Sequence, residues 1–409
     1  MSGWVSTRLG ELTELQSGFA FKSSQWTDDG VPVVKIGNVK DGFLDLSGCS
    51  YVSSEDADKS GSLLCNGDIL IGLTGYVGSV CRIQHSCKLV LNQRVGVFRP
   101  RVDAVNSNFL YFVARSVSFK QRVVGMAYGS AQPNVAPKQI LNIEINLPPI
   151  KEQRQIASIL GALDEKIENN RKTAATLEEM ARALYRSWFV DFDPVHAKAA
   201  GEKPAFMDEE TAALFPDRFG DDGLPDGWEQ TKVGQLCTIR GGKQLSKDEF
   251  SEAGQYPVFG GAGRMGAADR YNAEGFIVTV GRVGAYCGNF YHTIGKAWVN
   301  NNASIIVPGE NLPPEFLYLA LKYLDLSSIK KGAAQPFISN GDLAELEIVS
   351  PPAKLVRKAG QMFRYFFECL NEYERENKTL ATLRETLLPK LMSGEIRVGE
   401  AREQVEEVT

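Results

Sequence analysis

Histidines are scarce in this sequence, cysteines are few, and long apolar runs are absent. Three histidines in 409 residues are too few and too scattered to suggest a catalytic triad. The seven cysteines lack the paired spacing of a zinc site, so we expect reduced thiols and no disulfide framework. No apolar run approaches the roughly 18 residues needed to span a bilayer, and the amino terminus does not read as a secretory signal. The sequence therefore predicts a cytoplasmic protein without a membrane partner.

Motifs for several kinds of chemistry are also missing. No G-x-x-x-x-G-K-[ST] phosphate loop occurs, which argues against ATP hydrolysis by that machinery. Residues 259–263 fit the F-x-G-x-G pattern of S-adenosylmethionine sites, and residues 146–149 partly match the Asn-Pro-Pro-aromatic motif of amino-methyltransferases. The first lacks a preceding acidic strand, and the second lacks the aromatic residue that would stack on a flipped base. Cys81, His85 and Cys87 have irregular spacing and no fourth ligand. We predict no catalytic constellation, no metal and no cofactor in this chain.

The charge is slightly acidic and unevenly distributed. With 45 Lys and Arg against 50 Asp and Glu, the net charge is −5, which does not suit a protein that coats nucleic acid. The excess lies in residues 151–229, which hold 10 basic and 17 acidic residues. A DNA-binding role must therefore use locally placed basic residues, or share the contacts to phosphate with a partner.

An internal repeat organises the chain. Residues 129–149 (GSAQPNVAPKQILNIEINLPP) match residues 332–352 (GAAQPFISNGDLAELEIVSPP) at a constant offset of 203. Upstream, Gly75–Gly78 pairs with Gly281–Gly284 at an offset of 206, and Trp4 pairs with Trp228 at 224. Because these matches are colinear, the sequence predicts two copies of one unit of about 200 residues.

Each copy divides into a part with short β-branched runs and a helical tail. The pattern predicts β-rich regions at 1–149 and 228–352, with single helices near residues 108–123 and 314–329. Helices are predicted over 150–190 and 353–394, an acidic linker over 191–227 and a tail over 395–409. The linker is either a tether or a segment that wraps a partner. The fold class is α+β with an internal repeat.

Apolar residues in both tails alternate at intervals of four and three, which is typical of a coiled-coil seam. A helix over 151–188 would be on the order of 55–60 Å long. Two ordinary amphipathic helices are the alternative. The candidate seam and partner residues are Ile156, Leu160, Leu163, Ile167, Leu177, Leu184, Leu370, Leu380 and Leu387.

Polar and basic residues recur on corresponding loops of the two copies. Arg and Lys read guanine, Asn and Gln read adenine, and all four can bind phosphate. Taken singly, each is as well explained as solvated surface. The candidate DNA-binding residues are Lys88, Asn92, Gln93, Arg94, Ser130, Gln132, Asn134 and Lys138 in the first copy, and Arg264, Arg282, Asn301, Asn302, Lys331 and Gln335 in the second.

The sequence resembles the specificity subunit of Type I restriction-modification enzymes over nearly its whole length. The resemblance rests on Gly227-Trp228, on residues 256–261 (YPVFGG), on the Gly-x-x-Gly and Gly-x-x-Gln-Pro segments, and above all on the central run from Ile150 to Val195. It implies two target-recognition domains, at 1–149 and 228–352, separated by two helices that form an antiparallel coiled coil with pseudo-two-fold symmetry.

The resemblance also implies partners. We expect double-stranded DNA, two modification subunits that bring S-adenosylmethionine, and two restriction subunits that bring ATP and Mg²⁺. This chain would be the non-catalytic subunit, reading an asymmetric bipartite target with one half-site per domain and a gap set by the helices. A methyltransferase-like enzyme with a degenerate site and a scaffold that reads no sequence remain the alternatives.

Overall fold

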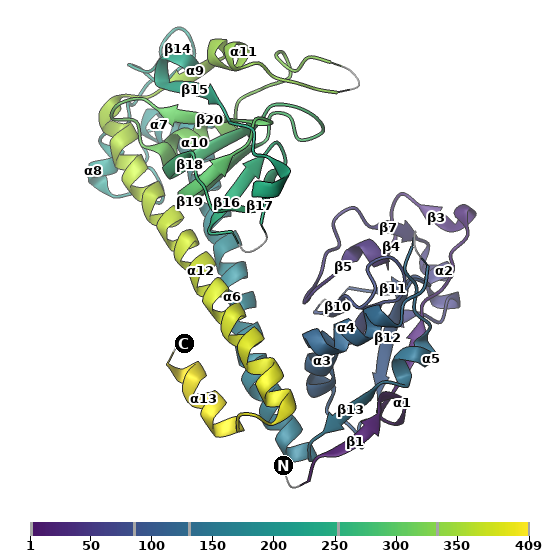
Figure 1. Ribbon diagram of the computed structural model, residues 1–409. Coiled ribbons are helices and arrows are strands. Elements are labelled where there is room, and N and C mark those ends of the chain that lie inside the picture. Colours follow the sequence, from purple (N-terminus) through teal and green to yellow (C-terminus); the bar gives the residue numbers. More distant parts are fainter. Residues whose placement is uncertain (1–2, 85–86, 130–131, 252–253, 333–334, 408–409) are drawn as a thin grey trace. The chain divides into compact units, whose positions relative to one another are not determined.

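The chain divides into two compact units, each with its own sheets and core. The structure is a computed structural model that describes residues 3–84, 87–129, 132–251, 254–332 and 335–407. Unit 1 comprises residues 1–169 and 376–409, and unit 2 comprises residues 170–375. The long helices α6 (Ile150–Phe189) and α12 (Ala353–Ser393) contribute residues to both units (Figure 1).

Unit 1 contains four small sheets. The first pairs β1 (Val5–Arg8) with β13 (Glu144–Leu147). The second has the order β10 (Val80–Arg82), β9 (Ile69–Gly72), β12 (Val95–Pro100), β2 (Thr13–Ser17). The third has the order β3 (Trp26–Thr27), β7 (Ser50–Val52), β4 (Val31–Val34), β11 (Leu89–Leu91), β8 (Leu63–Leu64), and the fourth pairs β5 (Val39–Lys40) with β6 (Phe43–Leu44).

Unit 1 also contains short helices. They are α1 (Leu9–Leu12), α2 (Ser54–Lys59), α3 (Ser107–Arg115), α4 (Val117–Gly125), α5 (Pro137–Leu141) and α13 (Val398–Glu406). The single helix expected over residues 108–123 is wrong, because the chain breaks between α3 and α4. Ser116 adopts an extended backbone conformation there, and its hydroxyl accepts a hydrogen bond from the Phe119 N–H at 3.3 Å. This side-chain cap begins a new helix.

Unit 2 contains one large sheet and one small sheet. The large sheet has the order β15 (Cys237–Gly241), β20 (Ala303–Pro308), β18 (Ala273–Gly281), β19 (Phe290–Val299), β16 (Tyr256–Gly260), β17 (Gly263–Ala268). The small sheet pairs β14 (Glu229–Lys232) with β21 (Glu347–Ser350). The short helices are α7 (Asp193–Ala199), α8 (Glu209–Ala212), α9 (Val233–Leu236), α10 (Pro314–Lys322) and α11 (Asn340–Glu345).

The internal repeat is visible in the strand pairing. In both units the first strand pairs antiparallel with the strand that precedes a long helix, β1 with β13 and β14 with β21. In both, a short helix then leads into a strand that pairs antiparallel with the last long strand, β2 with β12 and β15 with β20. The two units differ between these shared elements, where unit 1 has its five-stranded sheet and unit 2 has the β16–β17 hairpin.

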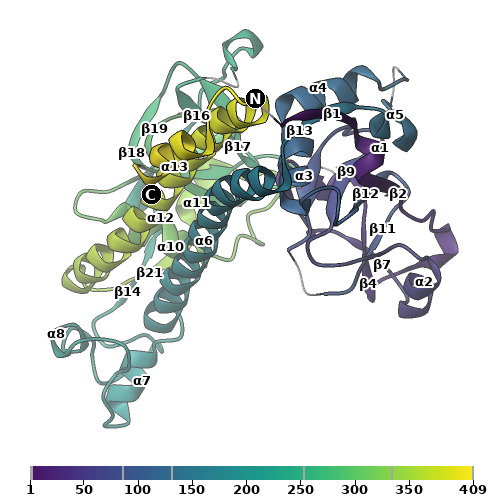
Figure 2. The same cartoon turned by 90° about the horizontal axis from the view of Figure 1, so that it is seen from below.

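The two long helices pair within each unit. In unit 1, Leu160 and Leu163 of α6 are buried in one core with Leu387, near the end of α12. In unit 2, the ring of Tyr185 near the end of α6 lies 6.1 Å from that of Phe363, near the beginning of α12. The helices therefore run antiparallel in each unit (Figures 1 and 2). The predicted α+β class with two long paired helices is confirmed.

The candidate seam residues differ in burial along the helices. Ile156, Leu160, Leu163, Ile167, Leu380 and Leu387 are buried, whereas Leu177, Leu184 and Leu370 are half-buried. In the unit 2 part of α6 the buried apolar residues are Ala181, Tyr185, Trp188 and Phe189, and Asn170 is buried as well. A straight α-helix drifts by about 20° per heptad relative to a repeat of 3.5 residues, so the buried face moves onto neighbouring positions.

The segments predicted as a linker and a tail both contain helices that pack against a core. Residues 191–227 hold α7 and α8, and Val195 and Phe215 are buried in the core of unit 2. The Lys198 ammonium donates to the Ala212 carbonyl at 3.2 Å. In the predicted tail, α13 buries Ala401 against the core of unit 1. The acidic segment is thus a packed part of unit 2 rather than a free tether.

Candidate nucleic-acid interface

Three loops of unit 1 are joined by backbone hydrogen bonds. They are residues 73–79 between β9 and β10, residues 92–94 between β11 and β12, and the described residues 128–129 and 132–135 before α5. The Gly75 N–H donates to the Pro133 carbonyl at 2.8 Å, and the Val135 N–H donates to the Leu73 carbonyl at 2.9 Å. The Leu73 N–H in turn donates to the Arg94 carbonyl at 3.0 Å. We call these three segments the reader loops of unit 1.

Unit 2 repeats this arrangement bond for bond. Its reader loops are residues 282–289, residues 300–302 and the described residues 331–332 and 335–338. The Gly284 N–H donates to the Pro336 carbonyl at 2.9 Å, and the Ile338 N–H donates to the Arg282 carbonyl at 2.9 Å. The Arg282 N–H donates to the Asn302 carbonyl at 3.0 Å. In each unit these bonds hold three loops, which are distant in sequence, in one fixed cluster.

The bonding also corrects one part of the sequence alignment. The sequence pairs Gly75–Gly78 with Gly281–Gly284, but Gly75 and Gly284 make the same hydrogen bond in their units. The equivalent segments are therefore Gly72–Gly75 and Gly281–Gly284, at an offset of 209. The expected offset of 206 is wrong because the first hairpin contains three glycines at a spacing of three residues, Gly72, Gly75 and Gly78, so two different pairs of them can be aligned with Gly281 and Gly284.

The reader loops of unit 1 carry several of the candidate DNA-binding residues. Gln93, Arg94 and Gln132 are exposed, and Asn92 is half-buried with its side-chain oxygen 3.4 Å from the Arg94 N–H. Asn134 accepts from the Thr74 hydroxyl at 2.6 Å and donates to the Tyr128 hydroxyl at 2.8 Å. Its amide therefore fastens the loops together. Ser130 lies outside the described residues.

The reader loops of unit 2 carry most of the second set. Asn301, Asn302 and Gln335 are exposed, whereas the Lys331 ammonium is held 2.7 Å from Asp342. Arg282 is half-buried, and within the described part of the chain its Nε is buried without a hydrogen-bond partner. The fold therefore leaves one buried polar atom of Arg282 unsatisfied.

Three candidates lie outside the reader loops. Lys88 precedes β11 and is paired with Asp58 at 2.7 Å, so its charge is already balanced. Lys138 is exposed on α5. Arg264 is exposed on β17, one residue beyond a hairpin turn, and a Cβ built on Gly261 in that turn would lie 3.3 Å from the Asn302 carbonyl. Arg264 is therefore close to a reader loop in space, and Lys138 follows a reader loop closely in sequence.

The candidates did not include Tyr76, Tyr286 and Phe337, although these are exposed aromatic side chains on the reader loops. Tyr76 and Tyr128 are 66% and 59% exposed in unit 1, and Tyr286 and Phe337 are 54% and 43% exposed in unit 2. Aromatic rings can stack on bases and contact sugars. The signal was available in the sequence, because Phe337 follows the Gln-Pro pair at the position that Asn134 occupies in the first copy.

The motifs considered for methyl transfer have structural roles. Phe259 and Gly260 end β16 and Gly263 begins β17, so the glycine-rich segment is a hairpin turn. Asn146 and Leu147 end β13, immediately before α6. Among the described residues, which exclude His85, no three His, Cys, Asp or Glu side chains are grouped to hold a metal ion. No described helix is both long and apolar enough to cross a membrane.

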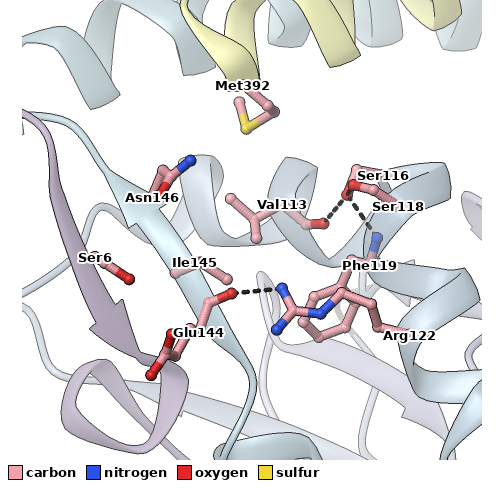
Figure 3. A pocket seen from close by; sticks show the side chains of 10 residues that line it. All are labelled: Ser6, Val113, Ser116, Ser118, Phe119, Arg122, Glu144, Ile145, Asn146 and Met392. Atoms are coloured by element: carbon pink, nitrogen blue, oxygen red, sulfur yellow. Dashed lines mark hydrogen bonds between the residues drawn. The ribbon is translucent and has the colours of Figure 1, made fainter. Parts of the chain in front are cut away.

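A polar cavity of about 350 Å³ in unit 1 has no catalytic arrangement (Figure 3). Its lining includes Arg122, which donates to the Glu144 carbonyl at 2.5 Å. Ser116 donates to the Val113 carbonyl at 2.7 Å and caps α4. These polar groups are engaged in holding the chain, and the lining contains no nucleophile paired with a base.

Comparisons with known proteins agree with this architecture. A family profile described as Type I restriction modification DNA specificity domain matches residues 1–179 and 225–381. The HindI specificity subunit of Haemophilus influenzae is 25% identical over 381 residues, covering 75% of this chain and 81% of that protein. A putative type I specificity subunit of Mycoplasma pneumoniae is 26% identical over 407 residues, covering 95% and 96%.

One solved structure has the same fold. The crystal structure of a Type I restriction-modification S subunit from M. genitalium superposes with a TM-score of 0.54 at 22% sequence identity. The alignment covers 95% of this chain and 96% of that one. The likeness therefore extends over both units and both long helices.

Proposed function

Because the chain belongs to the family of type I restriction-modification DNA specificity domains, we propose that it is the sequence-reading subunit of such a complex. Each unit would read one half of a bipartite DNA target with its reader loops. The observation that carries this proposal is the duplication of the loop cluster, with the same backbone bonds in both units and different exposed side chains.

The differences between the clusters support an asymmetric target. Gln93 and Arg94 in unit 1 correspond to Asn301 and Asn302 in unit 2. Arg prefers guanine and Asn prefers adenine in the major groove, so the two clusters are suited to different base pairs. We therefore expect two unlike half-sites, with a gap set by the length of α6 and α12, which continue from one unit into the other.

The acidic net charge favours a complex in which partner subunits supply part of the contacts to the DNA phosphates. Protein–DNA affinity depends strongly on the number of phosphates that basic residues neutralise. A chain of net charge −5, whose Lys88 and Lys331 are already paired with acids, offers few such contacts. We expect specific and tight binding only in a complex with two modification subunits, and restriction by two further subunits.

We assign methyl transfer to the modification subunits and ATP-dependent restriction to the restriction subunits. The methyl-transfer motifs of this chain are a hairpin turn and a strand end. We therefore propose that S-adenosylmethionine binds the modification subunits, and that ATP and Mg²⁺ bind the restriction subunits. The chain itself would be a non-catalytic component that works in the cytoplasm, where the DNA is.

The proposal is tested by expressing this chain with its modification subunit and mapping methylated bases on plasmid DNA. We expect a split, asymmetric motif with a constant gap. Methylation without any bipartite motif, or no methylation, contradicts the proposal and favours a scaffold that reads no sequence. Binding of S-adenosylmethionine by the isolated chain would instead favour the methyltransferase alternative.

A further inference from the structure

Each reader cluster contains a row of three side chains on one face. Antiparallel bridges join Thr74 to Asn134 and Asn134 to Tyr128 in unit 1. The corresponding bridges in unit 2 join Val283 to Phe337 and Phe337 to Lys331. Residues that lie opposite one another in antiparallel pairs project their side chains to the same face. The two rows are therefore equivalent in backbone and comparable residue by residue.

The first pair in each row is a close one. The bonds from Gly284 to Pro336 and from Ile338 to Arg282 flank Val283 and Phe337 without joining them directly. In such a non-hydrogen-bonded pair the Cα atoms are about 4.5 Å apart, and the side chains lie close together on one face. Val283 and Phe337 thus form one continuous apolar surface.

The two rows differ in chemistry. In unit 1 the row is a hydrogen-bonded chain, because Thr74 donates to Asn134 and Asn134 donates to Tyr128. In unit 2, Val283 is 39% exposed and Phe337 is 43% exposed. These apolar side chains sit among Arg282, Asn301 and Asn302, in a cluster that the hydrogen bonds hold rigid.

An apolar surface among polar base readers has a natural counterpart in the major groove. The thymine 5-methyl group is the apolar feature that DNA presents there, and aliphatic or aromatic side chains contact it. The buried core of unit 2 does not require Phe337, since its neighbour Ile338 is the residue that enters that core. The exposed pair is thus free to face a ligand.

We infer that Val283 and Phe337 contact a thymine 5-methyl group in the half-site read by unit 2. This inference rests on the proposed function and adds a specific atom of the DNA to it. In unit 1, the polar groups of Thr74 and Asn134 hydrogen-bond within the row. These two side chains therefore make no equivalent contact with a thymine methyl group. The two half-sites are therefore read by different chemistry from the same backbone position.

The test replaces thymine by deoxyuridine, which removes only the methyl group. The complex of this chain with its modification subunits is titrated with duplexes of the mapped target, each carrying one substitution. The half-site of unit 2 is identified beforehand as the one that relaxes when Asn301 and Asn302 are both replaced by Ala. We expect a three- to fivefold loss of affinity at one thymine of that half-site. This is the effect of losing the free energy gained when one methyl group is buried in the complex.

A variant then links the loss to the two side chains. Val283→Thr with Phe337→Asn places the residues of unit 1 in unit 2, and we expect it to bind the thymine and deoxyuridine duplexes equally. Val307→Thr changes a valine that is also 39% exposed but lies on β20, outside the reader loops; it is the matched control and should keep the difference.

The outcomes separate the inference from the proposed function. Tolerance of deoxyuridine at every thymine of the half-site of unit 2 overturns the inference and leaves the proposed function intact. So does a sensitivity that persists unchanged in the double variant. A complex that methylates no bipartite motif overturns both. The scan uses the unaltered protein first, so it gives a result even if the variant fails to fold.

Discussion

The two units have the same backbone at their reader loops and different side chains on it. Gly75 and Gly284 make the same hydrogen bond, as do Val135 and Ile338. Yet Asn134 is tied by side-chain hydrogen bonds where Phe337 is an exposed ring. The comparison teaches that main-chain bonds fix the position of the readers, which leaves the side chains able to differ between copies without loss of the cluster.

The units also hold their long helices by different means. In unit 1, Asp164 of α6 accepts from Arg115 of α3 at 2.8 Å and from Arg384 of α12 at 2.6 Å. In unit 2, the helices meet in an aromatic cluster, where the ring of Tyr185 lies 6.1 Å from that of Phe363 on α12, and Phe316 of α10 lies 5.4 Å from Tyr185 and 6.5 Å from Phe363. Unit 1 thus adds a largely buried ion network to the apolar contacts between its helices, whereas unit 2 packs aromatic rings there.

The largest loss of stability is expected when the aromatic cluster of unit 2 is disrupted. Phe363 is fully buried between α12 and the core of unit 2, so Phe363→Ala should lower the free energy of unfolding of unit 2 by roughly 3–5 kcal/mol. Hydrogen exchange followed by peptide mapping measures this for each unit. Tyr365→Ala, two residues along the same helix and 67% exposed, is the control and should change stability by about 0.5 kcal/mol or less.

Disrupting the ion network of unit 1 should lower stability by a somewhat smaller amount. Asp164→Ala leaves Arg115 and Arg384 without their shared carboxylate, and all three side chains are only 13–14% exposed. We expect a loss of about 2–4 kcal/mol, seen as faster exchange in unit 1. Glu385→Ala removes the 71% exposed partner of the same Arg384. An equal loss in this control would show that the buried position of Asp164 is unimportant.

A pH-dependent difference should follow from His292 in unit 2. Its ring is enclosed by Phe276, Tyr318 and Phe367, and burial lowers its pKa to about 4, helped by the positive charges of Lys322 and Arg182. The unfolded chain binds this proton near pH 6.5, so the neutral ring stabilises unit 2 fully above that pH. The contribution is lost progressively as the pH falls toward 4.

The expected size is about 2 kcal/mol between pH 7 and pH 5. Urea titrations at the two pH values measure it, and His292→Phe should remove this part of the pH dependence. If the variant and the unaltered protein lose the same stability on acidification, His292 is not the group responsible.

Much of the architecture could be predicted from the sequence. The repeated Gln-Pro segments and the apolar spacing after each Pro-Pro pair indicated two copies and two long helices, because these features depend on local spacing. The break at Ser116 and the drift of the buried face to Tyr185 depend on capping and on helix geometry, which residue spacing alone does not record. The packing of Phe215 into unit 2 likewise depends on a partner surface formed by distant residues.

The candidate interface was predicted in part. Residues next to the shared glycines and prolines, such as Gln132 and Arg282, lie on the reader loops. Lys88 lies outside the reader loops and is paired with Asp58. The sequence did not reveal this pairing, because basic character alone does not distinguish a free side chain from a paired one. Asn134 was taken as a base reader although its amide is occupied by Thr74 and Tyr128, a contact across 60 residues that composition does not reveal. Base contacts by any of these residues remain a prediction.

The most direct test of the account compares methylation maps for two double variants, each expressed with the modification subunit. Gln93→Ala with Arg94→Ala alters the reader loops of unit 1, and Asn301→Ala with Asn302→Ala alters those of unit 2. Since a lost base contact costs about 1–3 kcal/mol, each pair should relax one half-site, a different one in each case, and leave the gap unchanged. Relaxation of both half-sites by either pair, or of the same half-site by both, would contradict the claim that each unit reads its own half.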